Sequence, residues 1–194
     1  FMPWLSILLG FWVAAMRPRD GRAWLVLGIL VGLSQLVRPT GIDPRGWPLE
    51  IGPMAVAFRE LASTTWAICM MLFGIYFPQR WRVDRRLPWA KWLLIVPLTV
   101  AGLFHAAREV IACFSYEAAQ WPVQIPEGIS AALPMMATSV FFMALGSKYH
   151  DPELASDDRR RLKVIYWGST VAMLPSFVLI LYSIFILHRS LENS

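Results

Sequence analysis

Long apolar runs alternate with short polar stretches along the whole chain. A membrane span needs about 20 residues, and six of the runs are drawn as spans, although the first two are short. Backbone polar groups in lipid must be satisfied internally, so each run is predicted to be a helix. The pattern therefore predicts an all-α integral membrane protein, a single transmembrane domain over residues 1–194. Its six helices are expected over residues 1–16, 23–37, 53–77, 89–115, 129–146 and 164–187.

Basic residues fall mainly in every second polar stretch. Residues 17–22, 78–91 and 147–163 contain 13 of the 18 Lys and Arg residues, whereas residues 38–52 and 117–128 contain only two. Basic loops stay on the cytoplasmic side of a membrane. We therefore predict three helical hairpins with cytoplasmic basic turns, and both ends of this chain outside. That topology leads us to expect more protein on both sides of the sequence.

The composition favours the same class of protein. Hydrophobic residues make up 57% of the chain and charged residues 16%, whereas soluble domains carry about 25% charged residues. The basic clusters lie at helix ends beside Trp and Pro, so membrane topology explains them without a nucleic-acid partner. Cys69 and Cys113 are expected in opposite halves of the bundle, as small buried hydrophobes rather than a disulfide.

Four ionisable residues lie inside predicted spans, where charge is costly. Arg59 and Glu60 belong to the third span, and Arg108 and Glu109 to the fourth. Both pairs are predicted at similar depth in the outer leaflet, with His105 on the same helix face as Arg108 and Glu109. One interpretation is a polar cluster that senses a ligand or couples an outer domain to the bundle. The other is two interhelical ion pairs that hold the helices together.

No motif in the sequence indicates catalysis or a metal site. Phosphate-binding Gly-rich loops, paired Cys motifs, H-E-x-x-H and G-x-S-x-G are all absent from the sequence. No catalytic residue, metal or cofactor is therefore predicted. His105 is interpreted as a structural, hydrogen-bonded histidine, with the axial ligand of a pigment as the alternative. Gly28 and Gly32 form a G-x-x-x-G pattern, which predicts close helix packing.

Two stretches carry a family resemblance. These are GFWVAAMRPRDGRAWLVLGIL (10–30), and LFGIYFPQRWRVDRRLPWAKWLLIVPL (72–98) with its FP-x-R and PW-x-KWLL. Together they resemble the multi-helix membrane region of bacterial sensor proteins, namely competence-type sensor histidine kinases and acidobacterial sporulation-type serine/threonine phosphatases. Gln79 departs from the acidic residue more usual after FP. The resemblance implies an extracytoplasmic domain before the helices and a cytoplasmic kinase or phosphatase domain after them. Since the C-terminal end of this chain is predicted outside, an odd number of further spans is expected before that cytoplasmic domain.

These observations lead to one expected function and two alternatives. The expectation is a multi-pass module of the bacterial inner membrane that passes an extracytoplasmic or lipid-phase signal to an output domain beyond these residues. The expected partners are membrane lipids and a second copy or a larger membrane assembly. The first alternative is a non-catalytic accessory subunit that binds pigment or lipid. A transporter would need a polar site at mid-membrane, where the predicted bundle is nearly uncharged.

Overall fold

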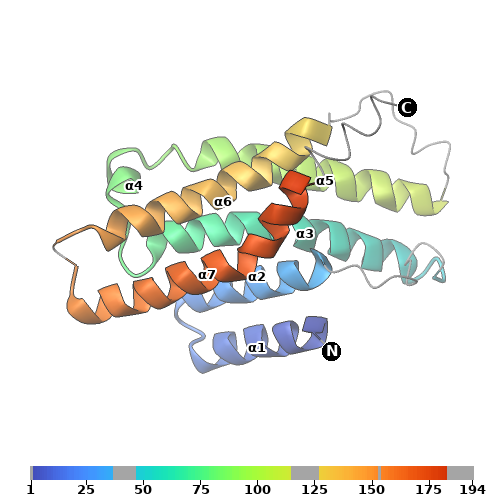
Figure 1. Cartoon of the computed structure of the whole chain (residues 1–194). Coiled ribbons are helices and arrows are strands. Elements are labelled where there is room, and N and C mark those ends of the chain that lie inside the picture. Colours follow the sequence, from blue (N-terminus) through green and yellow to red (C-terminus); the bar gives the residue numbers. More distant parts are fainter. Residues whose placement is uncertain (1, 37–46, 115–126, 153, 183–194) are drawn as a thin grey trace. The chain divides into compact units, whose positions relative to one another are not determined.

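The computed structural model describes residues 2–36, 47–114, 127–152 and 154–182, and these residues form helices without any strand. The helices are α1 (Met2–Met16), α2 (Gly21–Leu36), α3 (Gly52–Tyr76), α4 (Arg82–Arg86), α5 (Trp92–Phe114), α6 (Glu127–Tyr149) and α7 (Ser156–Tyr182). Figure 1 shows their order along the chain. The all-helical class predicted from the sequence is confirmed for this part of the chain.

Local sequence explains where several helices begin and end. The Asp20 carboxylate accepts a hydrogen bond from the backbone N–H of Arg22 at 3.0 Å, which satisfies one donor at the start of α2. Pro53 occupies the first turn of α3, where its missing N–H has no cost. Phe77 adopts an extended conformation after α3 and precedes Pro78, which disfavours helical geometry at the residue before it.

The boundaries differ most from the predicted spans in two places, and elsewhere by a few residues. The predicted polar turn 78–91 contains the five-residue helix α4. In addition, α7 begins at Ser156, eight positions before the predicted start at Val164. Ser156, Asp157 and Asp158 favour a helix N-terminus, because acidic side chains there interact favourably with the helix dipole. The hydropathy pattern could not locate this start, since the first turns of α7 are polar.

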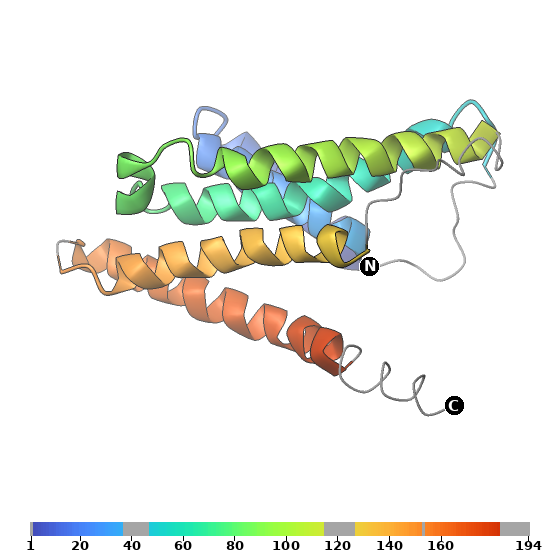
Figure 2. The ribbon, with the colours of Figure 1, turned by 90° about the horizontal axis from the view of Figure 1, so that it is seen from above.

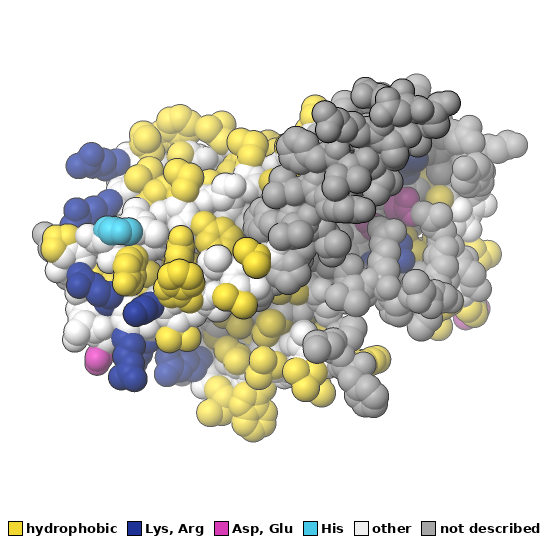
Figure 3. Space-filling view, in the orientation of Figure 1, with side chains coloured by type: hydrophobic (Ala, Val, Ile, Leu, Met, Phe, Trp, Pro, Cys, Tyr) yellow, Lys and Arg dark blue, Asp and Glu magenta, His cyan; other side chains and the backbone are white. Residues whose placement is uncertain are grey.

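Two of the described helices, α3 and α5, are long and apolar enough to cross a membrane. The apolar helices α1 and α2 are shorter. Many large hydrophobic side chains are exposed on these helices, including Trp12 (68%), Met54 (73%) and Leu93 (64%). Figure 3 shows hydrophobic side chains over much of the described surface that faces the viewer. This surface composition is typical of helices that face lipid.

Helix α2 approaches α3 closely at two glycines. A Cβ atom on Gly28 would lie 2.5 Å from Cys69 Sγ. One on Gly32 would overlap Trp66 and would lie 2.7 Å from the carbonyl oxygen of Ala62. The structure thus places both residues of the G-x-x-x-G pattern at the α2–α3 contact, where the missing side chains let the two backbones approach.

Helix α3 is central among the helices packed around it. It contacts both α2 and α5, and the three lie side by side in Figures 1 and 2. Its residues Ala67, Met71 and Ile75 form a buried core with Leu98 of α5 and Ala137 of α6. A Cβ on Gly74 would lie 2.9 Å from the Cα of Phe141, so α6 also reaches the α3 backbone at this point.

The chain forms two compact units, Phe1–Ala144 and Leu145–Ser194. The first contains the core just described. In the second, Arg159 of α7 donates a hydrogen bond to the carbonyl oxygen of Asp151 at 2.8 Å, and Leu162 is fully buried. This bond ties the first turn of α7 to the turn before it.

Candidate functional site

A buried carboxylate lies in the turn that joins α3 to α5. Asp84 of α4 is only 4% exposed. Its Oδ2 accepts a hydrogen bond from Arg80 Nε at 2.6 Å, and its Oδ1 accepts one from Lys91 Nζ at 3.1 Å. Lys91 Nζ also donates to the Tyr76 hydroxyl at 2.7 Å. We call Tyr76, Arg80, Asp84 and Lys91 the Asp84 network. Each carboxylate oxygen has a charged donor, as a buried anion requires.

The charges of this network stabilise one another. Burial alone would raise the pKa of Asp84, but hydrogen bonds from Arg80 and Lys91 and the charges of both cations outweigh burial and lower that pKa. The hydrogen bond to Tyr76 raises the pKa of Lys91, and burial lowers it. The hydrogen bond to Asp84 and the charge of that carboxylate raise the pKa further, so the net shift is upward. Asp84 is therefore an anion and Lys91 a cation at neutral pH.

The network joins three consecutive segments. Tyr76 is the last residue of α3, Asp84 lies in α4, and Lys91 immediately precedes α5. A backbone hydrogen bond of 2.8 Å from Trp81 N–H to the Ile75 carbonyl oxygen fixes the same turn. The contacts of Tyr76 and Lys91, at the two ends of the turn, therefore fix its geometry together with Asp84.

A small apolar pocket of about 110 Å³ lies beside the network. Met71 and Ile75 of α3, Leu94 of α5 and Val140 of α6 contribute to its wall, together with Asp84 and Lys91. Sites for drug-sized ligands or cofactors are about 300–1,000 Å³. This pocket is smaller than that range, and the charges beside it pair with one another.

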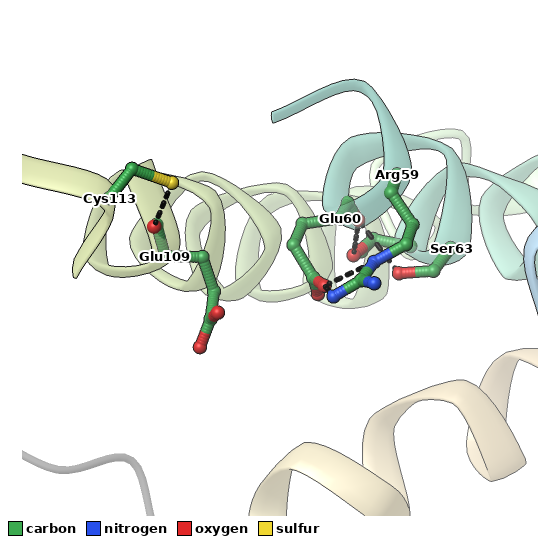
Figure 4. A network of polar contacts seen from close by, with 6 residues as sticks. Arg59, Glu60, Ser63, Glu109 and Cys113 are labelled. Carbon is green, nitrogen blue, oxygen red and sulfur yellow. Dashed lines mark hydrogen bonds and ion pairs between the residues drawn. The ribbon is translucent and has the colours of Figure 1, made fainter. Parts of the chain in front are cut away.

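The predicted polar group on α3 and α5 is arranged differently from the expectation. Arg59 Nη2 lies 3.2 Å from Glu60 Oε1, so these neighbours form an ion pair within α3 (Figure 4). These two charges therefore pair with each other on one helix, and the placement of the group in the outer leaflet stays a prediction. The Glu60 carbonyl oxygen also accepts hydrogen bonds from the hydroxyls of Ser63 and Thr64, at 2.8 Å and 3.0 Å.

The packing of α3 on α5 sets the register of Glu60 and Glu109. Gly102 of α5 lies directly against Thr64 of α3, because a Cβ on this glycine would be 2.9 Å from the Thr64 hydroxyl oxygen. The helices run in opposite directions, so Glu60, one turn before Thr64, is level with Ala106. Glu109 follows less than one turn later, and Figure 4 shows it on α5 beside the Arg59–Glu60 pair.

The other predicted residues of this group lie on α5. His105 and Arg108 are half-buried, and the His105 ring meets Phe104 edge to face with a centroid distance of 6.1 Å. Cys113 Sγ donates a hydrogen bond of 3.4 Å to the Glu109 carbonyl oxygen. In the described ranges, no group of three or more His, Cys, Asp or Glu residues is placed to hold a metal ion.

The sequence reasoning missed the Asp84 network. Asp84 is the sole acidic residue of the stretch 78–91, which contains five basic residues. A single carboxylate four residues after Arg80 and seven before Lys91 is the signal that could have revealed an internal ion network. The two cations belong to the FP-x-R and PW-x-KWLL patterns that carry the family resemblance.

Comparisons of the chain with protein-family models, curated proteins and solved structures found no match.

Proposed function

We propose that this chain is a multi-pass membrane module that transmits a conformational signal through the α3–α5 helix pair. The observation that carries the proposal is that one helix pair bears two polar groups, one at each end. Arg59 and Glu60 lie near the start of α3, and the Asp84 network closes the other end. Sixteen residues of helix, about 24 Å, separate Glu60 from Tyr76. A rigid pair of this length can carry a shift from one polar group to the other.

The proposed membrane arrangement has six helices in three hairpins, with basic turns on the cytoplasmic side of a bacterial inner membrane. Two helices of sufficient length and apolarity, and large exposed hydrophobic side chains, support it. The family resemblance in residues 10–30 and 72–98 supports a cytoplasmic kinase or phosphatase domain as the receiver of the signal. Phosphoryl chemistry then belongs to that domain, while the residues described here provide coupling.

The topology is tested by labelling introduced cysteines with a membrane-impermeant maleimide, in a background with Cys69 and Cys113 replaced by Ala. Arg19→Cys and Arg85→Cys should react only after the cells are permeabilised, because both positions are exposed in basic turns. Glu50→Cys, exposed before α3, should react in intact cells. Reaction of all three in intact cells would reject the arrangement.

The coupling is tested without knowledge of the signal. A spin label at Arg85→Cys reports the mobility of α4, and Glu60→Gln removes the charge that pairs with Arg59. We expect Glu60→Gln to change the mobility of the label. The matched control is Leu61→Gln, a change at the neighbouring exposed position, which should leave the spectrum as it is. An unchanged spectrum in the Glu60→Gln protein would reject the proposal.

A specific observation supports a second candidate, the accessory subunit of a membrane complex. Helix α1 exposes Trp4 (73%), Leu8 (68%) and Phe11 (57%) along its length. Such a face suits either lipid or the helix of another protein. Purification in mild detergent separates the two candidates. A stoichiometric partner subunit that is lost with Leu8→Ser and Phe11→Ser together would favour the accessory role.

A further inference from the structure

Helix α4 has two chemically opposite faces. Asp84 lies on the buried face and is held by Arg80 and Lys91. Arg85 and Arg86 are exposed, and with Arg82 they occupy positions i, i+3 and i+4 of the helix, which share one face. Because the Asp84 carboxylate pairs with Arg80 and Lys91, it is not the partner of Arg85 or Arg86.

Exposed apolar side chains lie in and just after α4, within three residues of these cations along the chain. Val83 is 42% exposed, Leu87 45% and Trp89 59%. Exposed Trp and aliphatic side chains next to Arg are typical of the zone where lipid headgroups meet acyl chains. Figure 3 shows Lys and Arg side chains at the end of the view where Figure 1 places α4.

We propose that the exposed face of α4 binds the headgroup of an acidic phospholipid. The phosphodiester accepts hydrogen bonds from the Arg85 and Arg86 guanidinium groups, which match phosphate geometry. Leu87 and Trp89 lie among the upper parts of the acyl chains. These apolar side chains favour a lipid over free phosphate, because acyl chains can remove them from water and an inorganic ion cannot. The Asp84 network contributes by holding α4 in a fixed orientation before the lipid binds.

This inference rests on the membrane placement proposed above and is independent of signalling. The test is native mass spectrometry of the full chain in detergent, titrated with phosphatidylglycerol or with phosphatidylcholine. Arg85→Gln with Arg86→Gln should weaken phosphatidylglycerol binding about thirtyfold, since each cation near a membrane surface contributes about a fivefold gain in affinity. Binding of phosphatidylcholine should not change.

Two further variants separate lipid binding from folding and from overall charge. Arg160→Gln with Arg161→Gln removes the same charge from exposed positions of α7 and should leave phosphatidylglycerol binding unchanged. Arg85→Lys with Arg86→Lys keeps the charge but loses the guanidinium geometry, so its affinity for phosphatidylglycerol should lie between those of the unmodified chain and the Gln variant. Equal weakening by the α7 and α4 variants would overturn the proposal, as would full competition by inorganic phosphate.

The outcome also distinguishes this inference from the membrane placement. If alkaline carbonate releases the chain from membranes, both proposals fail. If the chain stays in the membrane and the α4 variant binds phosphatidylglycerol like the unmodified chain, only the lipid site fails.

Discussion

A buried carboxylate is stable only where its lost hydration is replaced, and Asp84 meets this condition through two cations. The two contacts are not equivalent. The Lys91 side chain is 13% exposed, whereas the Arg80 side chain is 44% exposed and therefore partly hydrated. The Lys91 contact should therefore contribute more to the network, because screening by water weakens exposed pairs.

Replacing Asp84 with Asn should destabilise the protein. The change leaves Lys91 as a cation with its Tyr76 hydrogen bond but without its counter-charge. We expect the free energy of unfolding to fall by about 2–3 kcal/mol, less than for a fully buried pair because Arg80 is half-exposed. Denaturant unfolding in mixed micelles would measure it. Asp157→Asn, at an exposed position in the first turn of α7, should cost at most about 1 kcal/mol, the size of its interaction with the helix dipole. Equal losses in both variants would contradict the role of the network.

The stability that the Asp84 network contributes should depend on pH at both extremes. The pKa of Asp84 is lowered, so its contribution is present above the ordinary carboxyl pKa of about 3.9 and is lost as the pH falls through the folded value. The pKa of Lys91 is raised, so its contribution is present below about 10.4 and is lost as the pH rises through the folded value.

The stability difference between the unmodified chain and Asp84→Asn should therefore be constant at intermediate pH. It should shrink only below about pH 3.9 and above about pH 10.4. Unfolding of both proteins across the pH range would measure this difference. A difference that already falls between pH 5 and 8 would show that another group titrates with the network.

At the scale of helices, glycine determines how closely α2 can approach α3. Gly32→Ala should destabilise the protein by about 1–3 kcal/mol, because the new methyl group overlaps Trp66 and the Ala62 carbonyl group. Gly168→Ala is the matched control, since no heavy atom beyond its neighbouring residues and the local backbone of α7 lies within 4 Å of the added Cβ. That change should be neutral or stabilising by up to about 1 kcal/mol. Thermal unfolding of the two variants measures the contrast, and a neutral Gly32→Ala would exclude the close approach.

Hydropathy predicted the helical class because apolar runs are long and their interruptions are polar. It did not predict α4, since five residues with four charges carry no apolar period. The start of α7 was missed for the same reason, because acidic residues rather than apolar ones occupy its first turn. The sequence also identified Arg59 and Glu60 as charged residues within an apolar run. Their pairing within one helix depends on side-chain rotamers, which sequence spacing alone does not determine.

The Asp84 network was beyond sequence reasoning for a further physical reason. A charge count treats Arg80, Lys91 and Asp84 as contributions to one basic turn. Their pairing requires the chain to fold back after α3, which places Trp81 N–H on the Ile75 carbonyl oxygen. Tertiary geometry thus pairs two of the five cations of residues 78–91, the half-exposed Arg80 and the mostly buried Lys91, with one buried carboxylate. Arg85 and Arg86, which do not pair with Asp84, are the cations of the proposed lipid site.

Over the whole length of the α3–α5 pair, coupling between the two polar groups must be reciprocal. If Glu60→Gln alters α4, then Asp84→Asn must alter the region around Glu60 by the same coupling free energy. A spin label at Ala57→Cys, one turn before the Arg59–Glu60 pair, reports that region. We expect Asp84→Asn to shift the mobility of this label, whereas Asp157→Asn should not.

The double variant Glu60→Gln with Asp84→Asn should also show non-additive stability, because both changes act on one packed helix pair. Additive stabilities with an unchanged label would show that the two groups are energetically independent and that α3 and α5 hold the fold together without transmitting a signal.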